Sequence, residues 1–329
     1  MNVLVFGSSG FVGLNIVEAL LAGGHGVIGF DRAAVPAPAR AVFGTLPGHL
    51  EELEADVTDR TAIAHAVRPG LDAIVLGAAI TADAARDAAD PETILQVNLM
   101  AQIPILEHAR RSGTRRVINL SSGIVYGGVG AVADELTEEG PVDPVGLYAV
   151  SKYATERVGA RLASLWSLDH VNVRLSTVFG PWEHATGVRD TLSPQSQLAG
   201  LLGTGEAAVL ERPGLRDWVY APDVASAVLR LIEADRLGYR LFNVSAPTRW
   251  TVLDWGTRLA TLEPGFVCRV AKAGESPTVR MHSPGDRAPL SIARMRDDLG
   301  WQARFGMADS ADHFMAWWRD HGRELGRSR

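Results

Sequence analysis

The chain has few of the residues that build disulfides or metal centres. It holds one cysteine, Cys268, in 329 residues, which excludes an internal disulfide and any metal site made of several cysteines. We expect Cys268 to pack as a small apolar side chain. The nine histidines show neither H-x-x-x-H nor H-E-x-x-H spacing. The sequence therefore predicts no metal site.

Long apolar runs and an excess of positive charge are also missing. No run approaches the ~20 apolar residues of a membrane-spanning helix, and no basic stretch precedes the first strand, so we expect no secretory signal. The 32 basic and 38 acidic side chains give a net charge of −6. That balance provides no basic surface for nucleic acid or an anionic membrane. We therefore expect a globular, cytoplasmic protein that acts on a small molecule.

What the chain does have, at its start, is a glycine-rich turn between a strand and a helix. An apolar run of strand length ends at Gly7, and apolar residues recur at helical spacing from Phe11 onward. Glycines at 7, 10 and 13 allow a tight turn, close approach to a pyrophosphate and close packing of helix on strand. The helix N-terminus offers N–H groups to phosphates. We predict that Gly7, Gly10, Phe11 and Gly13 bind a dinucleotide, in preference to a glycine-punctuated unit without a ligand.

The next predicted strand, residues 26–30, ends at Asp31. An acid at this place can accept hydrogen bonds from the adenosine ribose hydroxyls, and it would repel a 2′-phosphate. We therefore predict NAD. Arg32 follows directly, and its guanidinium could meet that phosphate, which leaves NADP as the less favoured alternative.

Strand-like and helical segments alternate through the first half of the chain. We predict strands at 72–76, 116–120 and 171–175, and long helices over 91–111 and 148–166. Such alternation is typical of an α/β fold with a Rossmann-type, doubly wound parallel sheet.

Two further segments are candidates for contact with the cofactor. Asp56 and Val57 follow a predicted strand and could meet the adenine; the alternative, equally weighted, is the N-cap region of the next helix. Ala78 stands in a run of small residues at the end of the fourth strand, where a cofactor can approach the carboxyl edge of the sheet.

The pattern changes after residue 180, where Gly, Pro and Thr become frequent. We predict an NAD(P)-binding Rossmann domain over 1–178, to which 217–246 return. A smaller, discontinuous C-terminal α/β domain over 179–216 and 247–329 would bind the substrate. Ligand sites are common between two such lobes.

Tyr148 and Lys152 lie four residues apart in the run YAVSKYATE, and therefore on one face of a helix. The pKa of a free phenol is near 10, and a neighbouring cation favours the phenolate. A phenolate can take a proton from a substrate hydroxyl. The spacing by itself is short and common, so this interpretation depends on the glycine turn in the same chain.

The glycine turn, Asp31, Asn98, Ser121-Ser122, Tyr148 with Lys152, and the run RDWVYAPDVA stand in a fixed order. This order resembles the extended short-chain dehydrogenase/reductase family, in its NAD-dependent epimerase/dehydratase branch, which includes UDP-galactose 4-epimerase. The resemblance covers residues 1 to about 245.

The resemblance implies a role for each matching residue. Tyr148 would be the catalytic base, and Lys152 would bind the nicotinamide ribose and lower the pKa of the tyrosine. Ser122 would hydrogen-bond the reacting hydroxyl; the less favoured alternative is a serine that caps a turn. Asn98 would lie near the cofactor, but a structural side chain bonded to the backbone is equally weighted.

The departures from the family pattern concern the substrate. Dehydratases of this branch carry Asp-Glu where this chain has Gly123-Ile124, which disfavours dehydration. Nucleotide-sugar enzymes carry an Asn that contacts the diphosphate at the place of Ser176, and often an Arg near Ser283. Arg216 matches a diphosphate-binding arginine; alternatively it pairs with Asp217 or contacts a loop carbonyl.

Arg189, in the segment after Gly180-Pro181, could bind a carboxylate, although an exposed arginine is the favoured alternative. The best interpretation is an NAD-dependent sugar or nucleotide-sugar epimerase that abstracts hydride from a secondary hydroxyl, with Tyr148 as the base. The alternative is a dehydrogenase of a non-nucleotide sugar or sugar acid, and a further one is a non-catalytic NAD(P)-binding protein. We also expect a homodimer in which helices 91–111 and 148–166 pair with their copies.

Overall fold

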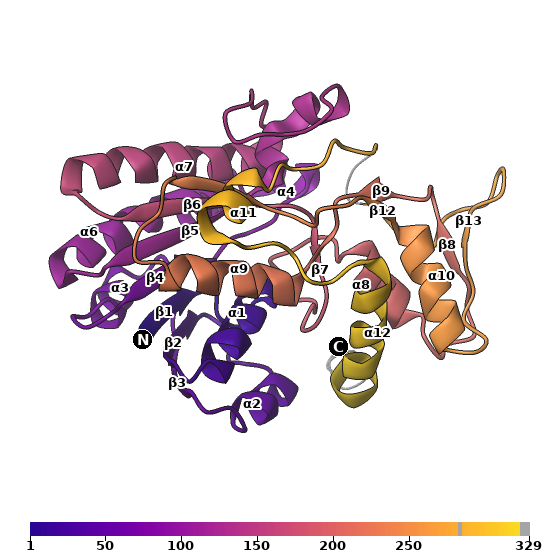
Figure 1. Ribbon diagram of the computed structural model, residues 1–329, viewed down its shortest axis with the longest axis horizontal. Coiled ribbons are helices and arrows are strands. Elements are labelled where there is room, and N and C mark those ends of the chain that lie inside the picture. Colours follow the sequence, from indigo (N-terminus) through magenta and orange to yellow (C-terminus); the bar gives the residue numbers. More distant parts are fainter. Residues whose placement is uncertain (282–284, 323–329) are drawn as a thin grey trace.

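A seven-stranded parallel sheet forms the centre of the larger lobe in the computed structural model, which describes residues 1–281 and 285–322 (Figure 1). The strand order is β11-β6-β5-β4-β1-β2-β3. The strands are β1 Asn2–Phe6, β2 Gly26–Asp31, β3 His49–Glu54, β4 Ala73–Leu76, β5 Arg116–Ser122, β6 His170–Leu175 and β11 Leu241–Val244. The order reverses beside β1, so the sheet is doubly wound as predicted.

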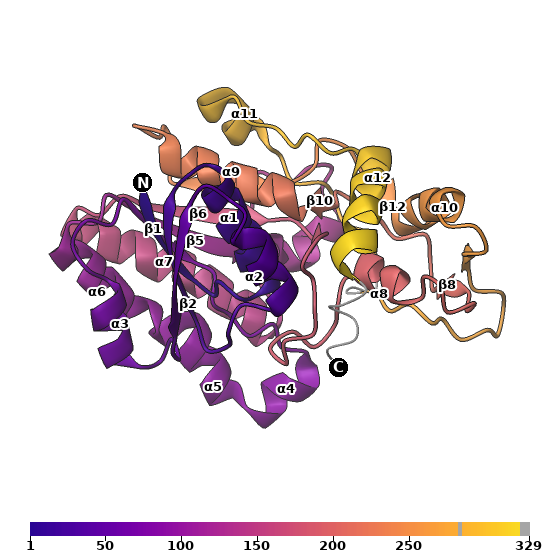
Figure 2. The same ribbon diagram turned by 90° about the horizontal axis from the view of Figure 1, so that it is seen from below.

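Helices cover both faces of this sheet (Figure 2). The helices of the larger lobe are α1 Phe11–Ala22, α2 Ala37–Phe43, α3 Arg60–Ala66, α4 Ala84–Ala89, α5 Pro91–Leu95, α6 Gln102–Ser112, α7 Gly146–Trp166 and α9 Ala221–Glu233, with the 3-10 helix η2 Gly123–Ala131. Val3 and Val5 of β1 pack in a cluster with α1 and α9. Leu4 and Phe6 pack in a second cluster with α3 and α6. Burial on both faces explains why the strand reads as one continuous apolar run.

The predicted helix over 91–111 is interrupted. α5 ends at Leu95, a π-helix (η1, Gln96–Met100) follows, and α6 begins at Gln102. The wider turn places the Asn98 side chain, 1% exposed, against the loop after β4. Such π-turns inside helices are frequent at functional sites. Pro104 in the next turn needs no N–H partner at the start of α6, so it is tolerated there.

The smaller lobe is built from short pieces. Its helices are α8 Pro194–Gly200, α10 Val252–Leu262, α12 Met307–Trp317 and the π-helix η3 Trp318–Gly322. Three strand pairs join them: β7 Val178–Phe179 with β10 Val219–Tyr220, β9 Leu215–Arg216 with β12 Trp250–Thr251, and β8 Ala208–Leu210 with β13 Cys268–Val270.

Aromatic side chains fill the core of this lobe. The Phe179 ring meets Trp250 and Trp255 edge-on, with centroids 5.3 and 5.8 Å away. Cys268 packs against Gly256 of α10, and burial raises the pKa of its thiol to about 11. A protonated, half-buried thiol agrees with the expectation that Cys268 is a packing residue.

The chain crosses between the lobes several times. β11 lies at the edge of the large sheet, and α11 (Ala293–Leu299) packs against β11 and α9 although it follows most of the smaller lobe in sequence. The domain boundaries drawn from the sequence remain a prediction. In the described part of the chain, none of the helices is both long and apolar enough to cross a membrane.

Candidate active site

A cleft of about 560 Å³ runs along the carboxyl ends of the central strands. The predicted cofactor residues that line it are Gly7, Gly10, Asp31, Asp56, Val57 and Ala78. The other predicted cofactor residues do not line the cleft: Phe11 and Gly13, in the first turn of α1, and Asn98, Tyr148 and Lys152. The carboxyl edge is where ligands bind in doubly wound sheets.

The glycine turn has the shape that a dinucleotide requires. Gly7 has φ +80°, and a Cβ built on it would lie 2.7 Å from the Ala78 nitrogen. A Cβ on Gly13 would lie 1.9 Å from the Gly7 carbonyl oxygen. Gly10 is the N-cap of α1 and supplies no side chain to the first-turn N–H groups. The turn can therefore admit a phosphate group to the helix N-terminus.

Asp31 and Arg32 both line the cleft. The Asp31 carboxylate accepts hydrogen bonds from the backbone N–H groups of Ser9 (3.0 Å) and Ala33 (3.1 Å). Burial raises the pKa of Asp31, and these bonds oppose the shift. An anion and a cation face the same cavity, so the preference for NAD over NADP remains a prediction.

Asp56 lies at the cleft and closes a turn of its own. Its Oδ1 accepts from the Thr58 N–H and from the Thr58 hydroxyl, and that hydroxyl bond lowers the pKa of Asp56. The cap of α3 is Asp59, which accepts from two N–H groups of the first turn. Asp56 thus lies both at the cleft and in the turn that leads to the N-cap of α3, and its contact with the adenine remains a prediction.

Tyr148 and Lys152 lie in the first two turns of α7. The Tyr148 hydroxyl interacts with the hydroxyls of Ser122 and Thr81. Thr81 follows Ile80, which lines the cleft, whereas Tyr148, Ser122 and Thr81 themselves do not line it. Ser122 also accepts from the Ile124 N–H at 3.2 Å. The serine therefore caps a turn and faces the phenol with the same oxygen.

The pKa of Tyr148 does not follow the expectation. Burial raises it, while Ser122, Arg189 and Thr81 lower it. Lys152 donates instead to the Leu120 carbonyl (2.7 Å), with its Nζ 5.8 Å from the centre of the Tyr148 ring. Burial also lowers the pKa of Lys152 to about 8, opposed by Glu156. The Lys152 ammonium donates to a carbonyl of β5 and not to the phenol, so burial has the largest effect on the pKa of Tyr148.

Asn98 behaves as the structural alternative described. Its Oδ1 accepts from the Ile80 N–H (2.7 Å), and its Nδ2 donates to the Ile80 carbonyl and the Ser151 hydroxyl. These bonds fix the loop that carries Thr81 toward Tyr148. Sequence reasoning missed Thr81, although a hydroxyl just beyond the small residues at a strand end is a usable signal.

Arg189 is not an exposed arginine. Its side chain is 22% exposed, pairs with the buried Glu183 at 2.8 Å, and lies 5.7 Å from the centre of the Phe11 ring. The surrounding segment, residues 187–190, forms a strap onto the loop 81–86. Thr81 exchanges backbone bonds with it, and Arg86 pairs with Asp190 at 3.1 Å. Val188 of the strap lines the cofactor cleft.

Ser176 and Arg216 lie beyond the phenol, toward the smaller lobe. The Ser176 hydroxyl donates to the Asp217 carbonyl (2.8 Å) and accepts from Arg287 (2.7 Å). Arg216 donates to the Gly285 carbonyl at 3.1 Å, which is the loop contact considered above, while Asp217 pairs with Arg287. Ser283 lies outside the described residues. Sequence reasoning gave no role to Arg287.

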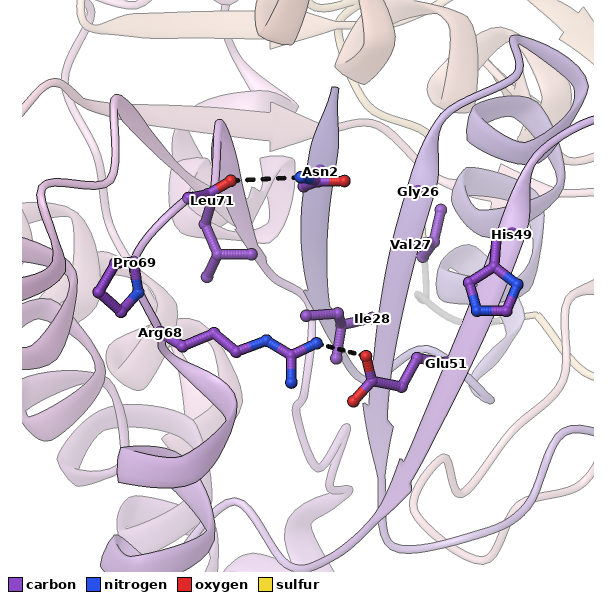
Figure 3. A pocket seen from close by; sticks show the side chains of 10 residues that line it. Asn2, Gly26, Val27, Ile28, His49, Glu51, Arg68, Pro69 and Leu71 are labelled. Carbon is purple, nitrogen blue, oxygen red and sulfur yellow. Dashed lines mark hydrogen bonds and ion pairs between the residues drawn. The ribbon is translucent and has the colours of Figure 1, made fainter.

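A second hollow, of about 190 Å³, lies at the opposite edge of the sheet (Figure 3). It is formed at the amino ends of β1, β2 and β3, and its Arg68 pairs with Glu51. This position is away from the carboxyl edge and from the predicted site residues. Within residues 1–281 and 285–322, no cluster of three or more His, Cys, Asp or Glu side chains is arranged to hold a metal ion.

Comparison with known proteins agrees with this geometry. Residues 3–245 match the model of the NAD dependent epimerase/dehydratase family. The chain is 28% identical to a UDP-glucose 4-epimerase of Mycolicibacterium smegmatis, over 94% of this chain and 96% of that protein. It is 27% identical to a dTDP-glucose 4,6-dehydratase of the same organism, over 97% and 96%.

The fold also matches a solved structure, UDP-glucose 4-epimerase from Bifidobacterium longum in complex with NAD⁺ and UDP. The TM-score is 0.80 at 20% identity, over 98% of this chain and 99% of the other. Because the relatives include dehydratases, the comparisons do not support the expectation that dehydration is disfavoured. The glycine turn, the cleft and the matched residues show that this chain belongs to the NAD-dependent epimerase/dehydratase family.

Proposed function

We propose that this protein is an NAD-dependent epimerase of a sugar or nucleotide sugar, in which Tyr148 accepts the proton of a secondary hydroxyl. The observation that carries the proposal is the position of the Tyr148 hydroxyl. It meets Ser122 and Thr81, and Thr81 follows Ile80, a residue that lines the cleft beginning at the glycine turn. A proton acceptor has a use there only if a substrate hydroxyl is oxidised.

The residues of the cleft fit NAD. Gly7, Gly10, Phe11 and Gly13 would hold the pyrophosphate, and Asp31 the adenosine ribose. Asp56, Val57 and Ala78 would border the adenine side of the cleft, and Lys152 would donate to the nicotinamide ribose. When bound, NAD supplies the hydride acceptor. Ser122 would hold the reacting hydroxyl toward Tyr148.

Epimerisation returns the hydride to the opposite face of the same carbon, so the cofactor stays bound through the cycle. The strap of residues 187–190 favours this outcome, because it ties the edge of the cleft to the loop 81–86. A specific observation supports the second candidate, a dehydrogenase of a non-nucleotide sugar or sugar acid. Ser176, at the place of a diphosphate-binding Asn, is already bonded to Asp217 and Arg287.

The test is a Tyr148→Phe variant assayed with UDP-, GDP- and dTDP-sugars and with free sugars and sugar acids. We expect kcat to fall on the order of 10²–10⁴-fold with unchanged NAD affinity. Tyr153→Phe, on the same helix and partly buried, is the matched control and should retain activity. A new stereoisomer without net NADH identifies an epimerase, and accumulating NADH a dehydrogenase. Full activity in Tyr148→Phe would refute the assigned base.

A further inference from the structure

We propose that Arg287 determines substrate specificity by binding a carboxylate on the sugar, an inference that rests on the proposed function of the same site. The residue comes from the C-terminal segment and reaches Gly123, the residue that follows Ser122 at the end of β5. The substrate class it indicates is an acidic sugar, either a nucleotide-linked uronic acid or a free sugar acid.

Two glycines make room for this side chain. A Cβ on Gly130 would lie 2.6 Å from Arg287 Cγ, and a Cβ on Gly123 would lie 2.6 Å from its Nη1. Any other residue at 123 would therefore displace the guanidinium. Gly123 directly follows Ser122, whose hydroxyl interacts with the Tyr148 hydroxyl. The guanidinium thus lies one residue away from the proposed hydride-transfer site.

The guanidinium is anchored on one side only. Its Nη2 donates to the Ser176 hydroxyl (2.7 Å) and to Asp217 (2.8 Å). Its Nη1 makes a long contact of 3.4 Å with the Gly123 carbonyl, and its buried Nε has no hydrogen-bond partner within residues 1–281 and 285–322. An arginine carries five N–H donors. Nη1, which lies at the Gly123 carbonyl, therefore keeps donor capacity for a ligand.

The local charge favours an anion. Asp217 is fully buried and accepts from Ser245, from the Leu290 N–H and from Arg287. Two carboxylates, Asp217 and Asp286, lie among three guanidinium groups, those of Arg212, Arg216 and Arg287. The pKa of Arg216 falls to about 10, chiefly through burial and then through repulsion from Arg287. An anionic ligand would offset this excess of positive charge.

A carboxylate fits better than a phosphate at this place. An anion next to Ser122 must be a substituent of the ring that is being oxidised, because Ser122 would hold the reacting hydroxyl. The planar fork of a guanidinium matches a carboxylate in two hydrogen bonds. A neutral hydroxymethyl group would leave those buried donors poorly paired, which is a strong basis for discrimination.

Binding can be measured without turnover in the Tyr148→Phe variant loaded with NAD⁺. Isothermal titration with UDP-glucuronate, UDP-glucose, UDP, glucuronate and glucose gives the dissociation constants. We expect the acid of at least one pair to bind about tenfold more tightly than its neutral counterpart, the worth of one charge-assisted bond. Preference within the UDP pair or within the free-sugar pair then identifies the source of the carboxylate.

Arg287→Lys and Arg287→Met, each added to Tyr148→Phe, should reduce or abolish this preference and leave affinity for UDP alone within about twofold. Arg287→Lys retains the charge opposite Asp217, so it keeps the test valid if Arg287→Met fails to fold. Arg212→Lys is the matched control: Arg212 pairs with Asp286 in the same arginine cluster and should keep the preference.

Two results would overturn the inference. One is equal binding of acids and neutral sugars by the variant that retains Arg287. The other is an equal loss of affinity for UDP, UDP-glucose and UDP-glucuronate in Arg287→Lys, which would assign the guanidinium to the diphosphate. Turnover of neutral sugars without acid preference would remove this inference and leave the proposed function intact. Preferential binding of acids without any hydride transfer would refute the proposed function and leave the binding of a carboxylate by Arg287 intact.

Discussion

At the residue scale, the site is governed by the cost of burying ionisable groups. Burial raises the pKa of Tyr148 and lowers the pKa of Lys152, so both groups are neutralised more easily than in water. Neighbours then restore part of each charge: Ser122, Arg189 and Thr81 favour the phenolate, and Glu156 favours the ammonium. The protonation of the candidate base Tyr148 therefore depends on what surrounds its oxygen rather than on the spacing of Tyr and Lys alone.

The glycine turn allows a sharp comparison at this scale. Gly13→Ala places a methyl group 1.9 Å from the Gly7 carbonyl oxygen, so the turn must shift. We expect a loss of stability on the order of 3 kcal/mol and loss of NAD binding, measured by urea unfolding and by titration. In Gly10→Ala the new Cβ lies 3.4 Å from the same oxygen. That variant should fold normally and bind NAD more weakly; equal stability of the two variants would contradict this account.

His170 makes stability depend on pH. Burial lowers the pKa of His170 to about 4, opposed by Asp169, and neither ring nitrogen has a hydrogen-bond partner within the described ranges. The folded state therefore takes up the proton less readily than the unfolded chain, where the pKa is about 6.5. Stability is complete above that value and falls as the pH drops from about 6.5 toward 4.

From pH 7.5 to pH 5 this group should remove about 2 kcal/mol of unfolding free energy. His170→Gln does not titrate, so its unfolding free energy should fall by about that much less over the same interval. A lower stability of the variant at every pH would not affect the comparison, which uses only the difference in slope. Parallel curves for the two proteins would show that His170 does not titrate on unfolding.

At the element scale, two irregular features shape the site. The π-helix η1 turns Asn98 toward the loop after β4, and the strap 187–190 closes on the far side of that loop. Thr81 is therefore held between them, beside Tyr148. Regular helices and strands carry the candidate catalytic residues, while these irregular segments position the loop beside them.

The strap provides a prediction about cofactor release. Arg86→Ala removes the ion pair with Asp190 and the bond to the Gly187 carbonyl. A partly exposed pair contributes about 0–1 kcal/mol, so NAD should dissociate about two- to fivefold faster in stopped-flow fluorescence. Arg258→Ala removes a surface pair with Asp312 that is remote from the cleft and should leave release unchanged. Unaltered release in Arg86→Ala would show that the strap does not retain the cofactor.

At the scale of the whole molecule, one face of the larger lobe carries exposed apolar side chains. Val150 and Leu165 of α7 and Met100 of η1 are 43%, 57% and 43% exposed. α7 packs beside η1 and α6, so these residues belong to neighbouring elements. Exposed apolar side chains on adjacent helices commonly form a dimer interface.

We expect sedimentation velocity to show a homodimer at micromolar concentration. Val150→Glu should shift the protein toward monomer, because a carboxylate would be buried without a partner between the two copies. Val267→Glu, 49% exposed but in the smaller lobe, should leave the dimer unchanged. A wild-type protein that sediments as a monomer would rule out the proposed assembly.

The alternation of strands and helices, the glycine turn and the placement of Tyr148 and Lys152 on one helix could be predicted because each depends on residues close in sequence. Strand and helix periods repeat within a few positions, and Gly7 is required by its own backbone angle. The break of the helix at η1 could not be predicted, since it depends on a bond between Asn98 and Ile80, which lies in another element.

The sequence by itself therefore determined the parallel sheet, the dinucleotide turn and the candidate base, because local periodicity and backbone geometry specify them. Only the tertiary structure decided that Arg287 lies against Gly123, 164 positions away in the chain, and that burial raises the pKa of Tyr148. Both results depend on contacts between segments that are distant in sequence. The burial of a side chain and the charges around it are set by all of its neighbours in space, and no local sequence pattern specifies them.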